Sequence, residues 1–360
     1  AGKTEDLFCV GASSSWHISL ELPALLLGLV LMIGICYMDY TRIAVYAKPI
    51  LIAYQVLLFI GLQVAGVKMN GSTRFIRMPF GNVLNLIDLL WLTIPLFAAV
   101  LYSYRGQGYR GILKAILWMI IPSYFLFIRS QSLIAAMILE VVYCVVLAAA
   151  VYKGWFQVCK KAVLTGIGAV VVLIPVLLAG GIWCFGMAYQ KERISAILSI
   201  GDHAADFPGV NVIREMISGS SVFHGNPQFK ELLTSVDGSV HLLASVVAAY
   251  GILAGILLVL CLVVLILRFA KISLNQKNQL GMVMGTGCTA LFLIQTVVFI
   301  LENLGGVGNM GIYCPFFGTG RSGMLTSYIL LGLLLSICRY QKTAPEPVIR
   351  SWRWRQRSQS

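Results

Sequence analysis

Long apolar stretches, separated by short polar segments, run through almost the whole chain. A helix that crosses a lipid bilayer needs about 20 consecutive, mainly apolar residues. Nine stretches approach or exceed this length: 18–38, 47–67, 84–103, 112–128, 132–151, 162–187, 240–267, 280–302 and 323–339. The pattern therefore predicts an all-α fold, a polytopic transmembrane helical bundle with about nine spans.

The fourth and fifth stretches are separated only by Arg129, Ser130 and Gln131. Two arrangements fit this spacing, a tight helical hairpin and one long kinked segment. The combined length of the two stretches is nearly twice what one bilayer crossing needs, which favours the hairpin.

Composition excludes an ordinary soluble domain. Hydrophobic residues make up 59% of the chain, charged residues only 11%, and the mean hydropathy is +0.86. Soluble domains carry about 25% charged residues. The formal net charge of +13 comes mostly from Lys and Arg in short loops between apolar stretches. That distribution is typical of a membrane protein and argues against a nucleic-acid partner, since no basic domain stands apart from the spans.

The distribution of Lys and Arg also predicts the orientation of the chain. If the segment 39–46 faces the cytoplasm, most of the 27 basic residues fall on that same side. The C-terminal segment 340–360 is then a basic cytoplasmic tail, whose alternating Trp and Arg are suited to the anionic inner leaflet. The segment 188–239 becomes a large extracytoplasmic loop, in which Val210 to Ile217 is a candidate for a short helix.

Signatures of metal or nucleophile chemistry are missing from the sequence. The four histidines show no HExxH spacing, and neither a GxSxG nor a Walker A motif occurs. We therefore expect no metal-binding motif and no organic cofactor, and a divalent cation is the one cofactor that the sequence leaves possible.

Three carboxylates fall inside or at the end of predicted spans, where charge is costly and raises a functional hypothesis. Asp88 and Glu302 lie near the outer face, where solvation at the interface is the simplest interpretation. Glu140 lies near the middle of a span, so it must face the interior of the bundle. It either pairs with a cation or stays protonated, as a neutral acid hydrogen-bonded between helices.

Basic side chains recur in the predicted outer segments. Arg74 lies in the segment 70–77, Lys191 and Arg193 open the large loop, and Arg321 with Ser322 precedes the last span. Together these groups could hold a phosphate-bearing substrate, because Arg binds phosphate oxygens in bidentate fashion. The alternative is that Lys and Arg at span ends simply extend to the membrane interface.

At these segments the chain resembles the SEDS family of shape, elongation, division and sporulation proteins, which includes RodA, FtsW and SpoVE. Residues 70–76 resemble the family's Gly-x-x-Arg-Trp-Ile outer loop, and residues 189–194 resemble its Tyr-Gln-x-x-Arg-Ile sequence. Residues 315–322 resemble its Leu-Pro-Phe-x-Ser-Tyr-Gly-Gly-Ser sequence. The resemblance extends from about residue 16 to residue 342. It implies one membrane domain over 1–360, with an incomplete N-terminus that lacks the first of the family's ten spans.

The resemblance implies a peptidoglycan glycosyltransferase that polymerises lipid II at the outer face of the bacterial cytoplasmic membrane, in division, shape or sporulation. The implied partners are lipid II, membrane lipids and a class B penicillin-binding protein. In the family, an Asp in a His-Thr-Asp-Phe sequence before the eighth span acts on the hydroxyl nucleophile. Asp237 is the nearest carboxylate to that position here, and it is the catalytic candidate. The resemblance also makes Arg74, Lys191, Arg193, Arg321 and Ser322 candidates for substrate binding.

Departures from the family pattern keep two other functions open. The His-Thr-Asp-Phe sequence is absent, and the Glu-Glu pair expected after it is Ala248-Ala249. These losses favour a non-catalytic scaffold of the division or elongation machinery. A transporter or a flippase of lipid-linked precursors is the third hypothesis, with Glu140 and helix breaks at Gly180-Gly181 and Gly305-Gly306 lining a pathway.

Overall fold

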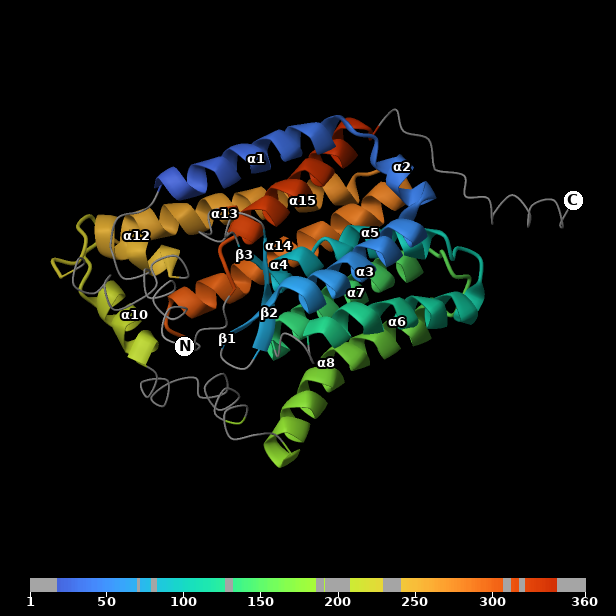
Figure 1. Cartoon of the computed structure of the whole chain (residues 1–360), viewed down its shortest axis with the longest axis horizontal. Helices are drawn as coiled ribbons and strands as arrows, with labels where there is room; N and C mark the ends of the chain where they lie inside the picture. Colours follow the sequence, from blue (N-terminus) through green and yellow to red (C-terminus); the bar gives the residue numbers. More distant parts are fainter. Residues whose placement is uncertain are drawn as a thin grey trace, which may run out of the picture. The chain divides into compact units, whose positions relative to one another are not determined.

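The computed structural model is a bundle of helices with one small sheet (Figure 1). It describes residues 18–69, 72–78, 83–126, 132–185, 191, 208–228, 241–306, 312–316 and 321–341. The chain forms two compact units: unit 1 comprises 1–24, 176–266 and 293–320, and unit 2 comprises 25–175, 267–292 and 321–360. Most of the predicted outer loop and the predicted basic tail lie outside the described residues, as do Arg193 and Asp237.

Every predicted span contains helix. The N-terminal helices and strands are α1 (Ile18–Tyr37), α2 (Tyr40–Val45), α3 (Ala47–Ala65), β1 (Gly66–Met69), β2 (Ser72–Arg77), β3 (Val83–Asn85), α4 (Leu86–Leu90) and α5 (Thr93–Tyr102). The remaining helices are α6 (Gly108–Tyr124), α7 (Leu133–Tyr152), α8 (Lys160–Phe185), α10 (Pro208–Ser218), α12 (Leu242–Tyr250), α13 (Ile252–Leu274), α14 (Gln279–Asn303) and α15 (Arg321–Arg339). The short helix predicted in the outer loop is confirmed by α10.

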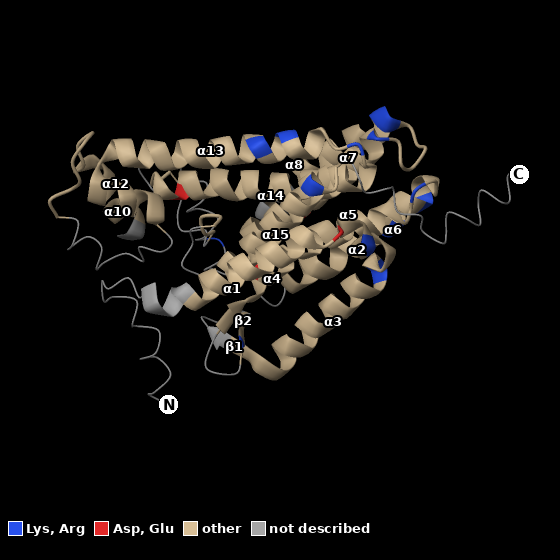
Figure 2. Ribbon diagram, turned by 90° about the horizontal axis from the view of Figure 1, so that it is seen from above, with Lys and Arg blue, Asp and Glu red and all other residues tan. Residues whose placement is uncertain are grey.

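Length and composition support membrane spans among the described residues. Five helices are long and apolar enough to cross a bilayer: Ala47–Ala65, Ile134–Tyr152, Ile252–Leu274, Gln279–Asn303 and Arg321–Arg339. Lys and Arg of unit 2 gather near the ends of helices such as α2 and α6 (Figure 2). The helices α6 and α7 are separate and contact each other, which confirms the predicted hairpin.

Unit 2 contains a three-stranded antiparallel sheet that the hydrophobic pattern did not predict. The strand order is β1-β2-β3, and Phe75 of β2 pairs with Asn85 of β3. The second predicted span consequently ends at Ala65, because Gly66 begins β1. At Gly66 an added Cβ would lie 2.2 Å from the carbonyl oxygen of Leu62, so only glycine allows this tight passage from helix to strand.

The seventh predicted span, 240–267, is wrong in its extent because the chain reverses direction at Gly251. This residue has φ +96°, and an added Cβ would lie 2.8 Å from the carbonyl oxygen of Val222. A Cβ on Gly255 would lie 2.4 Å from Val247, whereas eight residues of continuous helix would separate them by about 12 Å. Only α13 therefore forms the span, and α12 folds back alongside it.

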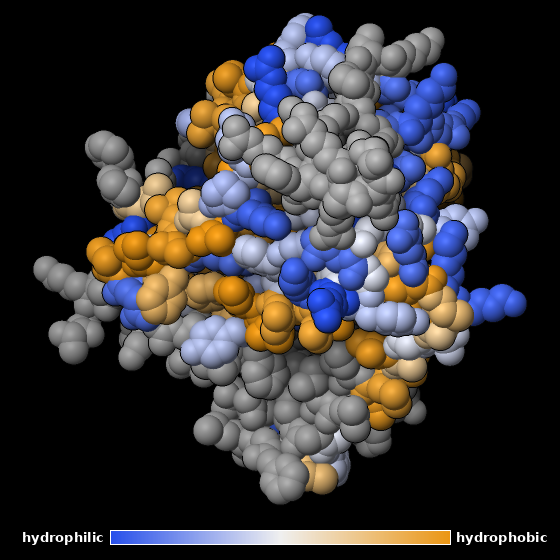
Figure 3. All heavy atoms as spheres, turned by 90° about the vertical axis from the view of Figure 1, so that its right-hand side faces the viewer, coloured by the Kyte–Doolittle hydropathy of each residue, from blue (hydrophilic) through white to orange (hydrophobic). Residues whose placement is uncertain are grey.

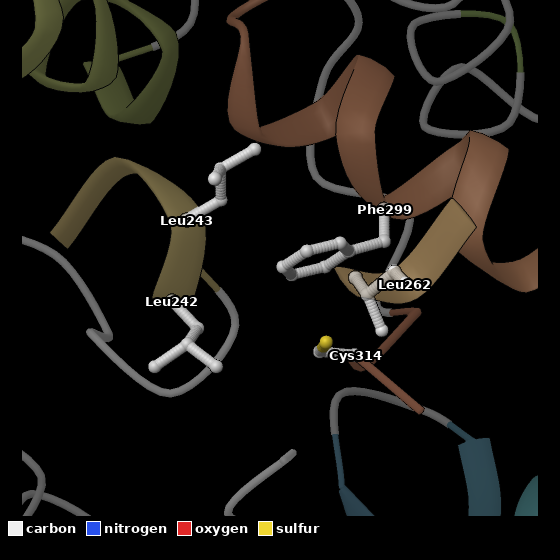
Figure 4. Packing of buried hydrophobic residues seen from close by; sticks show 5 residues of the cluster. All are labelled: Leu242, Leu243, Leu262, Phe299 and Cys314. Atoms are coloured by element: carbon white, nitrogen blue, oxygen red, sulfur yellow. The ribbon is translucent and has the colours of Figure 1, made fainter. Parts of the chain in front are cut away.

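The reversal is held by an apolar cluster within unit 1. Its buried members are Leu242, Leu243, Leu262, Phe299 and Cys314. Figure 4 shows the two leucines of α12 facing the side chains that come from α13, α14 and the segment after α14. Burying these side chains between helices stabilises the turn, since each fully buried Leu or Phe contributes roughly 1.5–3 kcal/mol.

Close packing of α1 against α15 fixes the last helix of unit 2. A Cβ on Gly28 would lie 2.8 Å from the Tyr328 ring, and one on Gly332 would lie 2.7 Å from the carbonyl oxygen of Met32. Near the other end of this contact, the Ser336 hydroxyl donates a 2.6 Å hydrogen bond to the carbonyl oxygen of Met38. Small residues allow this close approach between helices, which places the first turn of α15 beside α4 and β3.

Candidate functional site

A buried polar cluster joins three segments of unit 2 that are distant in the sequence. The Ser322 hydroxyl, in the first turn of α15, donates to Asp88 Oδ2 of α4 at 2.6 Å. The backbone N–H of Asn85, at the end of β3, donates to Ser322 Oγ at 3.1 Å. Asp88 is only 3% exposed, and Ser322 is buried as well. Interfacial solvation is therefore the wrong interpretation of Asp88, and it is equally wrong for Glu302, which is fully buried.

Local sequence explains why these groups meet. Asn85 is the N-cap of α4, and its side-chain oxygen accepts a hydrogen bond from the N–H of Ile87 at 3.1 Å. This cap places Asp88 in the first turn of α4. Since Asn85 also pairs with Phe75 across the sheet, the cluster lies beside the strand that contains Arg74.

Only one of the two oxygens of the Asp88 carboxyl group takes part in the hydrogen bonds of this cluster. Asp88 Oδ1 is buried and has no hydrogen-bond partner among the residues that the structure describes. A buried carboxylate is costly unless it is paired or fully hydrogen-bonded. This oxygen is therefore suited to hold a proton, which makes the buried carboxyl group neutral.

Several predicted substrate-binding residues belong to this region. Arg74 is the residue before Phe75 in β2, and Arg321 and Ser322 begin α15. The structure thus brings Asp88 and Ser322 into contact, and it places Arg321 and the backbone of Arg74 on the segments that surround them. Lys191 is a partly buried residue of unit 1. Arg193 and the catalytic candidate Asp237 lie outside the described residues.

Glu140 lies in a second polar contact, between α6 and α7. Its Oε1 is within hydrogen-bond distance of the Ser123 hydroxyl, which also lies 2.8 Å from the carbonyl oxygen of Met119. One hydroxyl proton cannot serve both acceptors at once, so the arrangement suits a protonated Glu140. No cation contacts this carboxyl group within the described part of the chain. The structure therefore favours the neutral interhelical acid over an ion pair.

Comparison with known proteins now identifies the family. The sequence profile of the FtsW/RodA/SpoVE family, described as cell cycle protein, matches residues 10–343. The chain belongs to the SEDS family. It is accordingly an integral membrane protein with the helical bundle of this family.

Relatives and solved structures agree with this membership. This SEDS protein is 25% identical over 319 residues to a probable peptidoglycan glycosyltransferase FtsW of Trichlorobacter lovleyi, covering 85% of this chain and 79% of the relative. An FtsW of Geobacter metallireducens with the same description is 23% identical over 335 residues, covering 89% and 84%. The fold resembles a chain of a peptidoglycan synthase complex that coordinates polymerization and crosslinking, with TM-score 0.74, 21% identity and coverage of 94% and 95%. It also resembles Thermus thermophilus RodA, with TM-score 0.62, 18% identity and coverage of 93% and 91%.

One polar residue of this SEDS protein was missed as a structural determinant. Asn303 ends α14 and is fully buried. Its Oδ1 accepts hydrogen bonds from the backbone N–H groups of Leu243 at 2.9 Å and Ala244 at 3.2 Å, and its Nδ2 donates to the carbonyl oxygen of Phe299. It therefore caps the first turn of α12, where His241 provides no side-chain cap. An amide that ends a long apolar stretch was the only sequence signal.

Replacing Ser322 with alanine tests the polar cluster. The variant leaves the buried Asp88 carboxyl group and the Asn85 N–H without their common partner, so the free energy of unfolding should fall by about 2 kcal/mol. Ser327→Ala is the matched control, because this serine lies on the same helix, is buried and has no hydrogen-bond partner among the described residues. Unfolding of the purified protein in detergent measures both variants. Equal losses for the two serines would contradict the role of the Asp88–Ser322 bond.

Proposed function

We propose that this SEDS protein polymerises lipid II into glycan strands at the outer face of the bacterial cytoplasmic membrane. The observation that carries the proposal is the match of nearly the whole chain to a subunit of a peptidoglycan synthase complex. The FtsW relatives, described as peptidoglycan glycosyltransferases, support it. The same comparison supports a class B penicillin-binding protein as the partner that cross-links the product.

The reaction assigns roles to the predicted site residues. The carboxylate of Asp237 takes the proton of the sugar 4-hydroxyl of one substrate molecule. The oxygen of that hydroxyl attacks the anomeric carbon of the second substrate molecule, and the bond from this carbon to the diphosphate breaks. Arg74, Lys191, Arg193 and Arg321 bind the diphosphate and stabilise the charge on the leaving group. Ser322 serves the site indirectly, because its single hydroxyl proton is donated to the buried Asp88 carboxyl group. A divalent cation would assist the same step, and no residue is assigned to hold it.

The charges at the helix ends support the orientation that we propose. Lys and Arg at the ends of α2, α6 and α15 support a cytoplasmic C-terminus and an outward-facing segment 188–239.

A non-catalytic scaffold is the second candidate, and one feature of unit 1 favours it. Ala248 occupies a position where the family resemblance led us to expect a glutamate. It is buried in an apolar cluster with Ile213, Met216 and Ala244. A charged side chain at this position would lose its hydration against α10, which is costly. Ala248 therefore contributes to apolar packing here, where the family would have an acidic group. The flippase hypothesis loses one of its supports, because α8 continues through Gly180 and Gly181 without the expected break.

Reconstitution of the full chain into proteoliposomes with fluorescent lipid II distinguishes these functions. We expect glycan strands on a gel, with and without a class B penicillin-binding protein, and a parallel reaction with a chelator tests the divalent cation. Binding of the penicillin-binding protein without polymer under any condition would contradict the proposal and support a non-catalytic scaffold. Movement of labelled lipid across the bilayer without polymer would contradict it and support a flippase.

A further inference from the structure

Two lysines from different helices of unit 2 converge on one aromatic ring. Lys48 Nζ, in the first turn of α3, lies 4.3 Å from the centroid of the Tyr104 ring, and Lys114 Nζ of α6 lies 5.7 Å from the same centroid. Tyr104 follows α5 and is only 7% exposed. Its hydroxyl accepts a 2.8 Å hydrogen bond from the indole N–H of Trp118. The ring is therefore a fixed platform, and the two cations are held by it.

Two positive charges lie close together at this platform. The two distances leave at most about 10 Å between the ammonium nitrogens, so the like charges repel. Lys48 also lies near the positive end of the α3 dipole, at a helix start that has no side-chain cap. Within the described part of the chain, neither lysine has a carboxylate partner, and Lys114 donates only to the neutral side-chain oxygen of Gln107. The ring offsets part of the repulsion, but an anion would offset more.

Apolar surface continues from the two lysines along both helices. Ile52 lies four residues after Lys48 on α3 and is 49% exposed, while Leu117 lies three residues after Lys114 on α6 and is 57% exposed. Residues at these spacings share a helix face. Figure 3 views the molecule from the side where α3 and α6 begin, and hydrophilic residues there lie next to exposed apolar ones. A ligand that bridges the lysines therefore has apolar surface below it.

We propose that Lys48, Lys114 and Tyr104 form a binding site for the phosphate headgroup of an anionic phospholipid of the cytoplasmic leaflet. The phosphate oxygens bridge the two ammonium groups, and the acyl chains lie along the exposed faces of α3 and α6. The apolar continuation favours a lipid over a soluble phosphate compound. This site is separate from the Asp88–Ser322 cluster and does not depend on glycosyltransferase activity.

Lipid exchange measured on the full chain in detergent by native mass spectrometry tests the site. Phosphatidylglycerol should bind in preference to phosphatidylcholine, and Lys48→Gln/Lys114→Gln should weaken phosphatidylglycerol binding about 25-fold. The control variant Lys160→Gln/Lys161→Gln removes the same charge from the exposed first turn of α8, and it should change phosphatidylglycerol binding little. Equal losses in the two double variants would show unspecific surface attraction and overturn the proposal.

Two further arms locate the ligand. Tyr104→Phe keeps the ring and should retain binding, whereas Tyr104→Leu should weaken binding although both lysines remain. Inorganic phosphate at millimolar concentration should fail to displace the lipid, because it lacks the apolar contacts. Displacement by phosphate, or equal binding of both lipids by the wild type, would overturn the assignment of a lipid. A thermal unfolding curve for each variant confirms that a loss of binding is not a loss of fold.

Discussion

Replacing Asp237 with alanine is expected to abolish lipid II polymerisation, lowering the rate at least about 100-fold. The only other carboxylates between Asp206 and the start of α12 are Glu215 and Glu231. Both lie farther than Asp237 from the position of the family's aspartate, so we expect neither to replace it as the base. Asp237→Asn preserves the size of the side chain but removes its basicity, so it should be equally inactive. Glycan strands formed by the purified full chain are the measure.

Other acids of the same outer segment provide the control. Asp202→Ala and Asp206→Ala remove the same charge from the segment 188–239 and should polymerise lipid II near the wild-type rate. Full activity of Asp237→Ala would exclude this residue from the mechanism while leaving the glycosyltransferase function in place. Inactivity of the wild type under every condition would instead remove the function itself, so the two failures are distinguishable.

Apolar length predicted where the helices lie. The stretches that became α7, α14 and α15 match their predicted bounds closely, because burial in lipid requires an unbroken run of apolar side chains. The helix α10 was also predicted within a polar segment. Its apolar residues recur at helical spacing, and Ile213 and Met216 indeed pack together against α12.

Apolar length did not predict where the chain turns. The residues around Gly251 are apolar on both sides, so hydropathy reads α12 and α13 as one span. The positive φ of Gly251 and its contact with the backbone of Val222 decide the reversal, and both depend on a segment about thirty residues away. The sheet was missed for a related reason, since β1, β2 and β3 are short and become stable only through pairing with one another.

The candidate site was likewise predicted only in part: the sequence identified its residues but not the contact between them. Asp88 and Ser322 were both selected from the sequence, one as a charge in a span and the other through the family resemblance. Their hydrogen bond joins residues that are 234 positions apart, and no local pattern contains such a contact. Burial of Asp88 was unforeseen for this reason, because the segment that covers it belongs to α15.

Asn303 is the residue whose replacement should most disturb unit 1. In Asn303→Leu the backbone N–H groups of Leu243 and Ala244 lose their acceptor while remaining buried, so the free energy of unfolding should fall by about 3 kcal/mol. Hydrogen exchange of these two amides should accelerate more than that of the rest of α12. Because α12 follows directly on the segment that contains Asp237, polymerisation of lipid II should fall with it.

Asn303→Asp separates the cap from the volume of the side chain. Aspartate keeps an oxygen for the two N–H groups, and a negative charge is favourable at a helix N-terminus, but it cannot donate to the carbonyl oxygen of Phe299. Both variants lose that last bond, so the difference between them isolates the cap. Asn303→Asp should therefore restore slow exchange at Leu243 and Ala244 and recover much of the activity. If leucine and aspartate gave the same exchange rates at both amides, Asn303 would act only by filling space.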